Sequence, residues 1–384
     1  DFSMGDGAAL LGHDHPGIRT ALLDQIGAGL HLGHATSLQV DMARLIQAAG
    51  PSNERIALCA NDDDAMILAC RAARTETGRE GIGVFIGSQH GRYGDAGSGN
   101  HTWGDGTRNV QLGAGIPRAI EDSTRALPYG HPAAFDLIRR YRNELAAVIA
   151  APVRFSDPHL DAGPWLRELG ELCRRNDIVL ILDETATGFR IAYGGAQEAL
   201  EVEADLVIYG KAIGGGLPLG AVAGRTPLMR PFSQDVSSQG IVGLGAFTGN
   251  TLPVAAGAAF LSYAHANQAT LYPALDRATA RLAEAFNAKA AALGVPATLR
   301  HAGSMFVISL GPANPRRPEA ALPRKPMDAF VVNALNAGII IHPNLTGYVS
   351  AAHTDEQVDQ AAKVFGNALT DLRADGLFTA LAQN

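Results

Sequence analysis

Three groups of polar side chains directly follow apolar runs, at positions where they could do chemistry. They are Asp183 after residues 178–182, Lys211 after residues 205–210, and the cluster Asp62-Asp63-Asp64 after residues 56–61. In an open parallel sheet, ligands bind outside the carboxyl ends of the strands. If the apolar runs are strands of such a sheet, these side chains meet at one edge and form a candidate catalytic site.

Lys211 and Asp183 suit chemistry at a carbonyl group. Lys211 is one of four lysines in the chain and lies just before Gly214-Gly215-Gly216. Partial burial favours a neutral amine, which can form a Schiff base with an aldehyde or ketone. A buried aspartate can hold the protonated ring nitrogen of pyridoxal phosphate (PLP). An ordinary ion pair between neighbouring strands would place both residues in the same way, so spacing alone leaves both interpretations open.

The apolar runs alternate with segments of helical period. We expect strands over residues 56–59, 83–86, 147–151, 178–183 and 205–209, and helices over residues 37–49, 62–74 and 162–175. Such alternation is typical of a mostly parallel sheet wrapped by helices. The sequence therefore predicts an α/β fold in which the three polar groups lie at strand ends.

The chain changes character after residue 249. Residues 252–264 and 271–293 predict two alanine-rich helices, followed by strands over 304–310 and 338–342 and a helix over 355–374. This order suits a compact α+β unit. We therefore expect a large coenzyme-binding domain over residues 50–250 and a small C-terminal domain over 251–384. An N-terminal segment, residues 1–49, is expected to pack with the small domain.

Two motifs carry a family resemblance. Residues 183–190 read Asp-Glu-Thr-Ala-Thr-Gly-Phe-Arg, and residues 209–220 read Tyr-Gly-Lys-Ala-Ile-Gly-Gly-Gly-Leu-Pro-Leu-Gly. Together they resemble the signature of class III aminotransferases, within the group that is similar to glutamate-1-semialdehyde aminomutase. Further matches cover nearly the whole chain in order, at residues 11–16, 71–79, 248–253 and 350–353. Residues 115–117 and 127–130 resemble aminotransferase domains of polyketide and nonribosomal peptide pathways.

The resemblance implies a fold type I enzyme that uses PLP. It implies an internal aldimine on Lys211, which would also move protons between the substrate's α-carbon and C4′ of the coenzyme. By the same resemblance Asp183 would pair with the pyridinium nitrogen, Thr185 would lie against one ring face, and Gln89-His90 would occupy the place of an aromatic residue and the histidine after it. The implied homodimer builds each active site from two subunits, with Thr248 reaching the phosphate of the partner's coenzyme.

Several residues depart from the family pattern at the coenzyme site. Where the family has a turn like Ser-Gly-Thr-Glu-Ala, whose N–H groups bind the coenzyme phosphate, this chain has Asn61-Asp62-Asp63-Asp64-Ala65. Gln89 replaces the aromatic residue that stacks on the ring and offers less dispersion. Ala151 replaces a glutamate, and Ala246 replaces a phosphate-binding threonine. We therefore expect Asp62 and Asp63 to weaken the binding of the phosphate.

Two hypotheses of function follow. The first is PLP-dependent amino transfer to an aldehyde or ketone in a specialised biosynthetic pathway, such as antibiotic synthesis. The second is a repurposed scaffold with weak or no coenzyme binding, which catalyses another reaction in the same cleft or acts as a non-catalytic partner. In the second, Asp62, Asp63 and Asp64 could take Mg²⁺ or Ca²⁺. Three consecutive acids on a helix cannot all converge, so we expect no metal site.

Arg154 and Trp103 are weaker candidates for contacts with a small or carrier-bound carbonyl substrate. Arg154 follows the expected strand over residues 147–151, and its planar guanidinium suits a carboxylate or phosphate. An ion pair would account for it equally well. Trp103 lies in a loop rich in Gly, Asn and Thr, where it could line the substrate entrance or anchor a surface loop.

Composition argues against several kinds of partner. The net charge of −7 and the pI near 5.9 give no basic surface for nucleic acid. No apolar run approaches the roughly 20 residues of a membrane helix, and Asp1 starts without a leader segment, so we expect a domain boundary at Asp1 and a cytoplasmic location. Cys59, Cys70 and Cys173 are odd in number and lack metal or redox spacing, which favours inert, reduced core residues.

Overall fold

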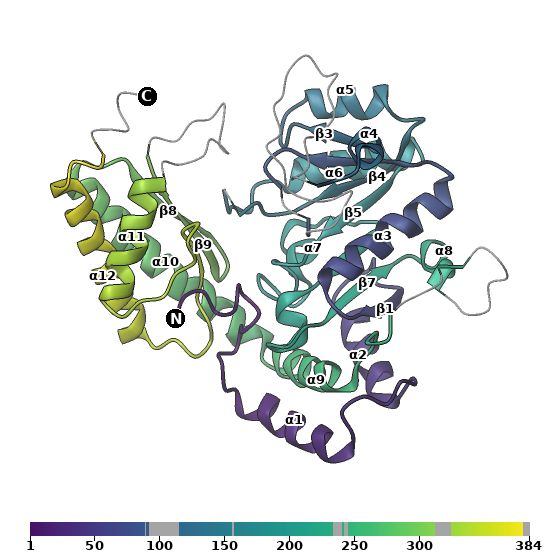
Figure 1. Ribbon diagram of the computed structural model, residues 1–384, viewed down its shortest axis with the longest axis horizontal. Helices are drawn as coiled ribbons and strands as arrows, with labels where there is room; N and C mark the ends of the chain where they lie inside the picture. The colour runs from purple at the N-terminus through teal and green to yellow at the C-terminus, as the bar shows by residue number, and fades with distance from the viewer. Residues whose placement is uncertain are drawn as a thin grey trace. The chain divides into compact units, whose positions relative to one another are not determined.

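The computed structural model describes residues 1–88, 90–91, 115–155, 157–232, 240–241, 245–311 and 324–378. The chain forms two compact units. The large unit comprises Pro16–Pro152 and Leu160–Ala266, and the small unit comprises Asp1–His15, Val153–His159 and Asn267–Asn384. Each unit has a sheet of its own (Figure 1).

The sheet of the large unit has seven strands in the order β1-β7-β6-β5-β4-β2-β3. They are β1 (Arg55–Cys59), β2 (Gly81–Phe85), β3 (Thr124–Leu127), β4 (Leu145–Ala150), β5 (Val179–Asp183), β6 (Leu206–Tyr209) and β7 (Gly220–Gly224). β2 pairs in parallel with β3 and β4, β5 pairs in parallel with β4 and β6, and β7 runs antiparallel to both neighbours. The predicted α/β fold with a mostly parallel sheet is confirmed.

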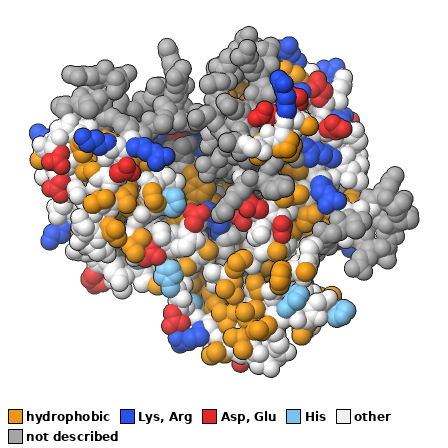
Figure 2. Space-filling model, in the orientation of Figure 1, with side chains coloured by type: hydrophobic (Ala, Val, Ile, Leu, Met, Phe, Trp, Pro, Cys, Tyr) orange, Lys and Arg blue, Asp and Glu red, His pale blue; other side chains and the backbone are white. Residues whose placement is uncertain are grey.

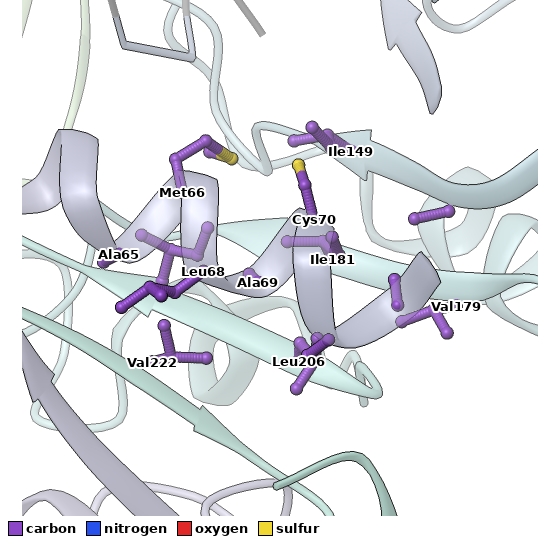
Figure 3. Packing of buried hydrophobic residues seen from close by; sticks show 14 of the residues in the cluster. Ala65, Met66, Leu68, Ala69, Cys70, Ile149, Val179, Ile181, Leu206 and Val222 are labelled. Carbon is purple, nitrogen blue, oxygen red and sulfur yellow. The ribbon is translucent and has the colours of Figure 1, made fainter. Parts of the chain in front are cut away.

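The large unit also contains helices, several of which pack on this sheet. They are α1 (Pro16–Ala28), α2 (Ser37–Gln47), α3 (Asp62–Thr77), α4 (Arg118–Ser123), α5 (Ala133–Arg140), α6 (Gly163–Arg175), α7 (Gly195–Leu200), α8 (Thr226–Met229) and α9 (Thr251–Ala266). Every residue of β4, β5 and β6 is buried, as expected for parallel strands covered on both faces. Figure 3 shows Cys70 of α3 next to Ile181 of β5, with Ala65 and Ala69 of the same helix in the same buried cluster. The short alanine side chains let α3 lie close to the sheet.

The helix α9 supports the segment that follows β6. That segment is the 3₁₀ turn η2 (Lys211–Gly214), and α9 packs on it as well as along α1 and α2. Gly257 of α9 has no side chain, and a Cβ there would collide with the carbonyl oxygen of Ile213. The close contact fixes the backbone of η2 against a long helix.

Within its described residues, the small unit contains a three-stranded antiparallel sheet and three helices. The strands β8 (Ala297–Ala302), β9 (Met305–Leu310) and β10 (Thr346–Tyr348) lie in the order β10-β9-β8. The helices are α10 (Gln268–Leu293), α11 (Arg324–Asn336) and α12 (Asp355–Ala374), and α10 packs against β8 and α12. Phe2, Phe306, Phe330 and Phe365 form an aromatic core, with Phe365 contacting the other three rings.

The predicted strand over residues 338–342 is wrong. Ile339 and Ile341 are buried whereas Ile340 is 49% exposed, so the alternation that suggested a strand is present. The Ile340 carbonyl accepts a hydrogen bond from Phe2 N–H at 2.8 Å. The Phe2 carbonyl in turn accepts a hydrogen bond from the N–H of Tyr348 in β10 at 2.7 Å, so this extended segment bonds to Phe2 and not to a strand of the sheet.

The compact units do not follow the predicted domain boundaries. Of the N-terminal segment, only residues 1–15 cluster with the small unit, because α1 and α2 pack on α9. For the same reason the large unit extends to Ala266 rather than to residue 250. The coenzyme-binding role of the large domain stays a prediction at this stage.

The three cysteines are all buried, and none is in a disulfide. Burial raises the pKa of the Cys59 thiol to about 12, so this thiol stays protonated and unreactive. The buried, reduced state matches the expectation from the sequence. Among the described helices, none combines the length and the apolar character that crossing a membrane requires.

Candidate functional site

The candidate site lies at one edge of the sheet in the large unit. β5 ends at Asp183, β6 leads through Gly210 to Lys211, and β1 leads through Asn61 into α3. β1 runs in the same direction as β6, because both are antiparallel to β7. The carboxyl ends of β1, β5 and β6 therefore meet at one edge. Asp62, the first residue of α3, interacts electrostatically with both Lys211 and Asp183 there.

Two neighbouring side chains hold the Asp183 carboxylate. Its Oδ2 atom lies 2.7 Å from Nδ1 of His90, and both side chains are buried. Its Oδ1 atom accepts hydrogen bonds from the backbone N–H of Thr185 at 3.0 Å and from the Thr185 hydroxyl. Burial alone would raise the pKa of Asp183, but His90 and Thr185 outweigh it and hold this pKa below its ordinary value. Asp183 is therefore a buried, ionised carboxylate.

His90 has a buried ring nitrogen on its other side. Because an ionised carboxylate only accepts hydrogen bonds, Nδ1 of His90 carries the proton and donates a hydrogen bond to Asp183. Nε2 of His90 is buried and has no hydrogen-bond partner among the residues that the structure describes. Buried polar atoms are nearly always paired. Nε2 is therefore a position at which a bound molecule could complete the site.

Lys211 has an unusual backbone conformation. Its φ of 46° lies in the left-handed region, which costs a residue with a Cβ about 1–2 kcal/mol. Lys211 opens η2, and Gly215 with φ 59° ends that turn. Such strain persists only where the surroundings enforce it, and it is common at functional sites. The packing of α9 on η2 supplies that enforcement.

Asp62 lies against the residue that precedes Lys211. A Cβ on Gly210 would lie only 2.6 Å from Cβ of Asp62. Burial raises the pKa of Asp62, the charge of Asp63 raises it further, and Lys211 lowers it. The start of α3 thus places a partly buried carboxyl group next to the lysine.

Asp63 and Asn61 complete the start of α3. Oδ1 of Asp63 lies 2.5 Å from the position of a Cβ on Gly91, so Asp63 is next to the residue after His90. The Asn61 side chain accepts a hydrogen bond from the N–H of Asp64 at 2.8 Å. Helix starts often bind anions through free N–H groups. In this helix, the chain's own Asn61 caps the start and carboxylates lie beside it.

No three His, Cys, Asp or Glu side chains within the described ranges are arranged to hold a metal ion. The cation interpretation of Asp62, Asp63 and Asp64 therefore gains no support. The neighbours of these residues give a reason, since Asp62 lies against Gly210 and Asp63 against Gly91. Asp62 and Asp63 thus lie against different residues of the site.

Three further predicted site residues are Gln89, Trp103 and Arg154. Gln89 and Trp103 lie outside the described residues. Arg154 belongs to the small unit, where its Nη2 lies 3.7 Å from Oδ2 of Asp157. Asp157 is also paired with Arg300. The structure thus contains the ion pair that we considered as the alternative to a substrate contact.

Thr248 lies on the turn that precedes α9. Its N–H donates to the Gly245 carbonyl at 3.3 Å. The Gln39 side chain of α2 donates to the carbonyl of Gly249 at 2.5 Å and ties the turn to that helix. The role of Thr248 towards a partner's coenzyme stays a prediction.

A buried polar network next to the site has no signal in the sequence spacing. Glu184 accepts hydrogen bonds from the N–H groups of Ala196 and Gln197 and from the hydroxyl of Thr187. Burial raises the pKa of Glu184 to about 7. Gln197 also donates to the hydroxyl of Tyr209 at 3.1 Å. The network joins the start of α7 to the last residue of β6.

Comparisons with known proteins identify relatives that cover most of the chain. A family model described as "Aminotransferase class-III" matches residues 1–369. The glutamate-1-semialdehyde 2,1-aminomutase of Methanocorpusculum labreanum is 34% identical over 377 residues, which cover 95% of this chain and 87% of that protein. An omega-transaminase from Sphaerobacter thermophilus has a similar structure, with a TM-score of 0.90, 30% identity, and coverage of 97% of this chain and 87% of the other. A structure described as a transaminase with PLP bound gives a TM-score of 0.87, 26% identity, and coverage of 98% and 87%.

Proposed function

The chain belongs to the class-III aminotransferases, whose expected coenzyme is PLP, and on this premise we propose that it transfers an amino group to an aldehyde or ketone. We assign Lys211 as the residue that bonds to the coenzyme, and Asp183 as the partner of its ring nitrogen. The observation that carries the proposal is the ionised Asp183, paired with His90, at the sheet edge that also holds Lys211.

The residues at the Asp183 end of the site fit the coenzyme ring. A protonated pyridine nitrogen needs a buried acceptor that stays ionised, and His90 and Thr185 keep Asp183 in that state. Each carboxylate oxygen can accept more than one hydrogen bond, so acceptor capacity remains. When bound, PLP supplies an electron sink for the charge that develops at the substrate's α-carbon.

Proton transfer is assigned to Lys211. Its Nζ would take the proton from the substrate's α-carbon and return it at C4′ of the coenzyme. Such a residue must be held within reach of both atoms, and the constrained backbone of η2 supports this requirement. Asp62 next to Gly210 provides a carboxyl group close to the amine.

We also propose that the chain forms the homodimer that is typical of the family. An apolar surface, which we call the α1 surface, is made of side chains that are 48–63% exposed: Leu23, Ile26, Leu30, Leu32, Val40 and Phe247. Figure 2 shows hydrophobic side chains gathered over this part of the large unit. An exposed apolar patch of this kind is typical of a protein interface.

Contacts within the large unit connect the α1 surface to the turn that carries Thr248. The ring of His31 lies 5.5 Å from that of Phe247, and the Thr251 hydroxyl donates to the Leu30 carbonyl at 3.0 Å. A second copy seated on the α1 surface would therefore lie next to Thr248. This supports the expectation that Thr248 contributes to the partner's coenzyme site.

The nature of the substrate rests on the relatives. Their names include an aminomutase and transaminases, so intramolecular exchange of an amino group is the second candidate. Consumption of glutamate-1-semialdehyde without any added amine or keto acid would favour the aminomutase. A place in a specialised pathway stays a prediction, which rests on residues 115–117 and 127–130. The cytoplasmic location also stays a prediction.

A spectroscopic experiment tests the proposed function. Purified protein is incubated with excess PLP and then with a panel of amino donors, and the absorbance of the bound coenzyme is recorded. We expect visible absorbance that is lost when a donor converts the coenzyme to its amine form. Protein that stays colourless with excess PLP would contradict the proposal and favour a scaffold that does not use the coenzyme.

A further inference from the structure

The start of α3 is filled by the chain's own carboxyl groups. Asp62 occupies the space against Gly210, where even an added Cβ would collide, and Asp63 lies equally close to Gly91. Both glycines are next to residues of the site, Lys211 and His90. Any group bound near the lysine at this end must therefore meet these carboxylates.

The N–H groups at this helix start are also partly used. The Asn61 side chain accepts a hydrogen bond from the N–H of Asp64 at 2.8 Å, which takes up one of the N–H groups that a helix start leaves free. Phosphate sites at helix starts depend on free N–H groups and an uncompensated helix dipole. In this chain, carboxylates already compensate the dipole. Burial, and then the charges of Asp63 and Asp183, raise the pKa of Asp62, as is usual where acidic groups lie close together away from water.

We propose that the start of α3 selects against a dianionic phosphate, so that the protein binds unphosphorylated pyridoxal with an affinity close to that for PLP. Asp62 and Asp63 are the residues that set this discrimination. The inference rests on the proposed function, because it concerns an aldehyde bound at Lys211. It deepens that function by naming the chemical class of coenzyme that the site accepts.

The two ligands differ at the 5′ position, where PLP carries the phosphate and pyridoxal carries a hydroxyl that closes on the aldehyde as a hemiacetal in water. The open aldehyde of each ligand condenses with the Lys211 amine, forming one C=N bond and releasing one water. Both also present the same ring nitrogen to Asp183. When each dissociation constant is referred to the open aldehyde, their ratio therefore isolates the contribution of the phosphate at α3.

The experiment titrates the full chain, freed of coenzyme, with PLP and with pyridoxal, and follows absorbance of the bound aldehyde. We expect the two dissociation constants to lie within about 10-fold of each other, since the repulsion of two carboxylates offsets the attraction of the helix start. In Asp62→Asn with Asp63→Asn, the affinity for PLP relative to that for pyridoxal should rise about 10-fold or more, because the loss of charge near Lys211 affects both aldehydes alike and only PLP carries the phosphate. Pyridoxal binding also shows that the variant is folded.

The matched control is Asp64→Asn, which removes the same charge from the same helical turn. Asp64 interacts electrostatically with Cys59 of β1 rather than lying against Gly210 or Gly91, so a smaller change in PLP affinity is expected. A wild-type preference for PLP above about 10-fold, or a double variant that affects both aldehydes equally, would overturn the inference and leave the proposed function intact. Failure of both aldehydes to bind would overturn the inference together with the proposed function.

Discussion

Nδ1 of His90 lies 2.7 Å from Oδ2 of Asp183, although 93 residues separate them in the sequence. The pairing brings the residues after β2 against the end of β5. A buried carboxylate without such a donor would tend to take up a proton. His90 is thus a positioning residue that keeps Asp183 charged for the ring of a bound coenzyme.

We predict that His90→Phe lowers kcat about 10–100-fold, because a hydrogen bond to a charged group contributes roughly 1.5–3 kcal/mol. The pKa of Asp183 should rise, so the acid limb of the pH–rate profile should move to higher pH. His90→Asn keeps an N–H donor near the Nδ1 position and should lose much less activity. Equal losses in the two variants, with no displacement of the acid limb, would refute this role.

We predict that Gly210→Ala destabilises the protein by about 1–3 kcal/mol, which is typical for a side chain forced into filled space. The φ of Gly210 is extended, so the collision with Asp62 is the main cost. In an Asp62→Gly background the colliding Cβ is gone, and the penalty should shrink. Urea unfolding of the four proteins measures the coupling, and an unchanged penalty would show that Asp62 is not the obstacle.

We predict a pH dependence of stability from Glu184. Burial raises its pKa to about 7 from an ordinary 4.5. Its contribution to stability is therefore complete below about pH 4.5 and is lost as the pH rises through about 7, by roughly 3 kcal/mol in total. Glu184→Gln should remove this part of the pH dependence, as measured by denaturant unfolding between pH 5 and pH 8.

The matched control for Glu184 is Glu203→Gln, which neutralises an exposed carboxylate in the same unit. It should leave the pH dependence as in the wild type. If both variants alter the pH dependence of stability equally, the buried position of Glu184 does not govern that dependence.

We predict that Leu23→Asp with Ile26→Asp yields monomers in sedimentation experiments, because charges in an apolar interface oppose association. Val332→Asp on α11 introduces a charge at another apolar side chain that is 52% exposed and should leave the dimer intact. A dimer that survives the double change would exclude the α1 surface as the interface.

The strands that carry Asp183 and Lys211 could be predicted because β5 and β6 are buried on both faces and therefore appear as continuous apolar runs. β7 gives no such signal. Its sequence is Gly-Ala-Val-Ala-Gly, and a Cβ at Gly220 would collide with the Asn61 backbone. Small residues chosen for close packing do not show the periodicity on which strand prediction depends.

The site could also be predicted only in part, and the reason differs from the one given for β7. The ends of neighbouring strands bring Lys211, Asp183 and the start of α3 together, and spacing along the chain is enough to suggest it. The support for Asp183 comes from His90, and the support for Lys211 comes from α9, both distant in sequence. Hydrogen bonds and packing of this kind depend on the tertiary fold and leave no local pattern.

The most direct measurement of the central claim is the site of covalent attachment of the coenzyme. The protein is incubated with PLP, the bond is fixed with borohydride, and the modified peptide is located by mass spectrometry. We predict that PLP modifies Lys211 in the wild type. In Lys211→Arg, which keeps the positive charge, the corresponding peptide should carry no PLP. Modification confined to Lys289, Lys325 or Lys363, or equal labelling of the variant, would contradict the assignment of Lys211.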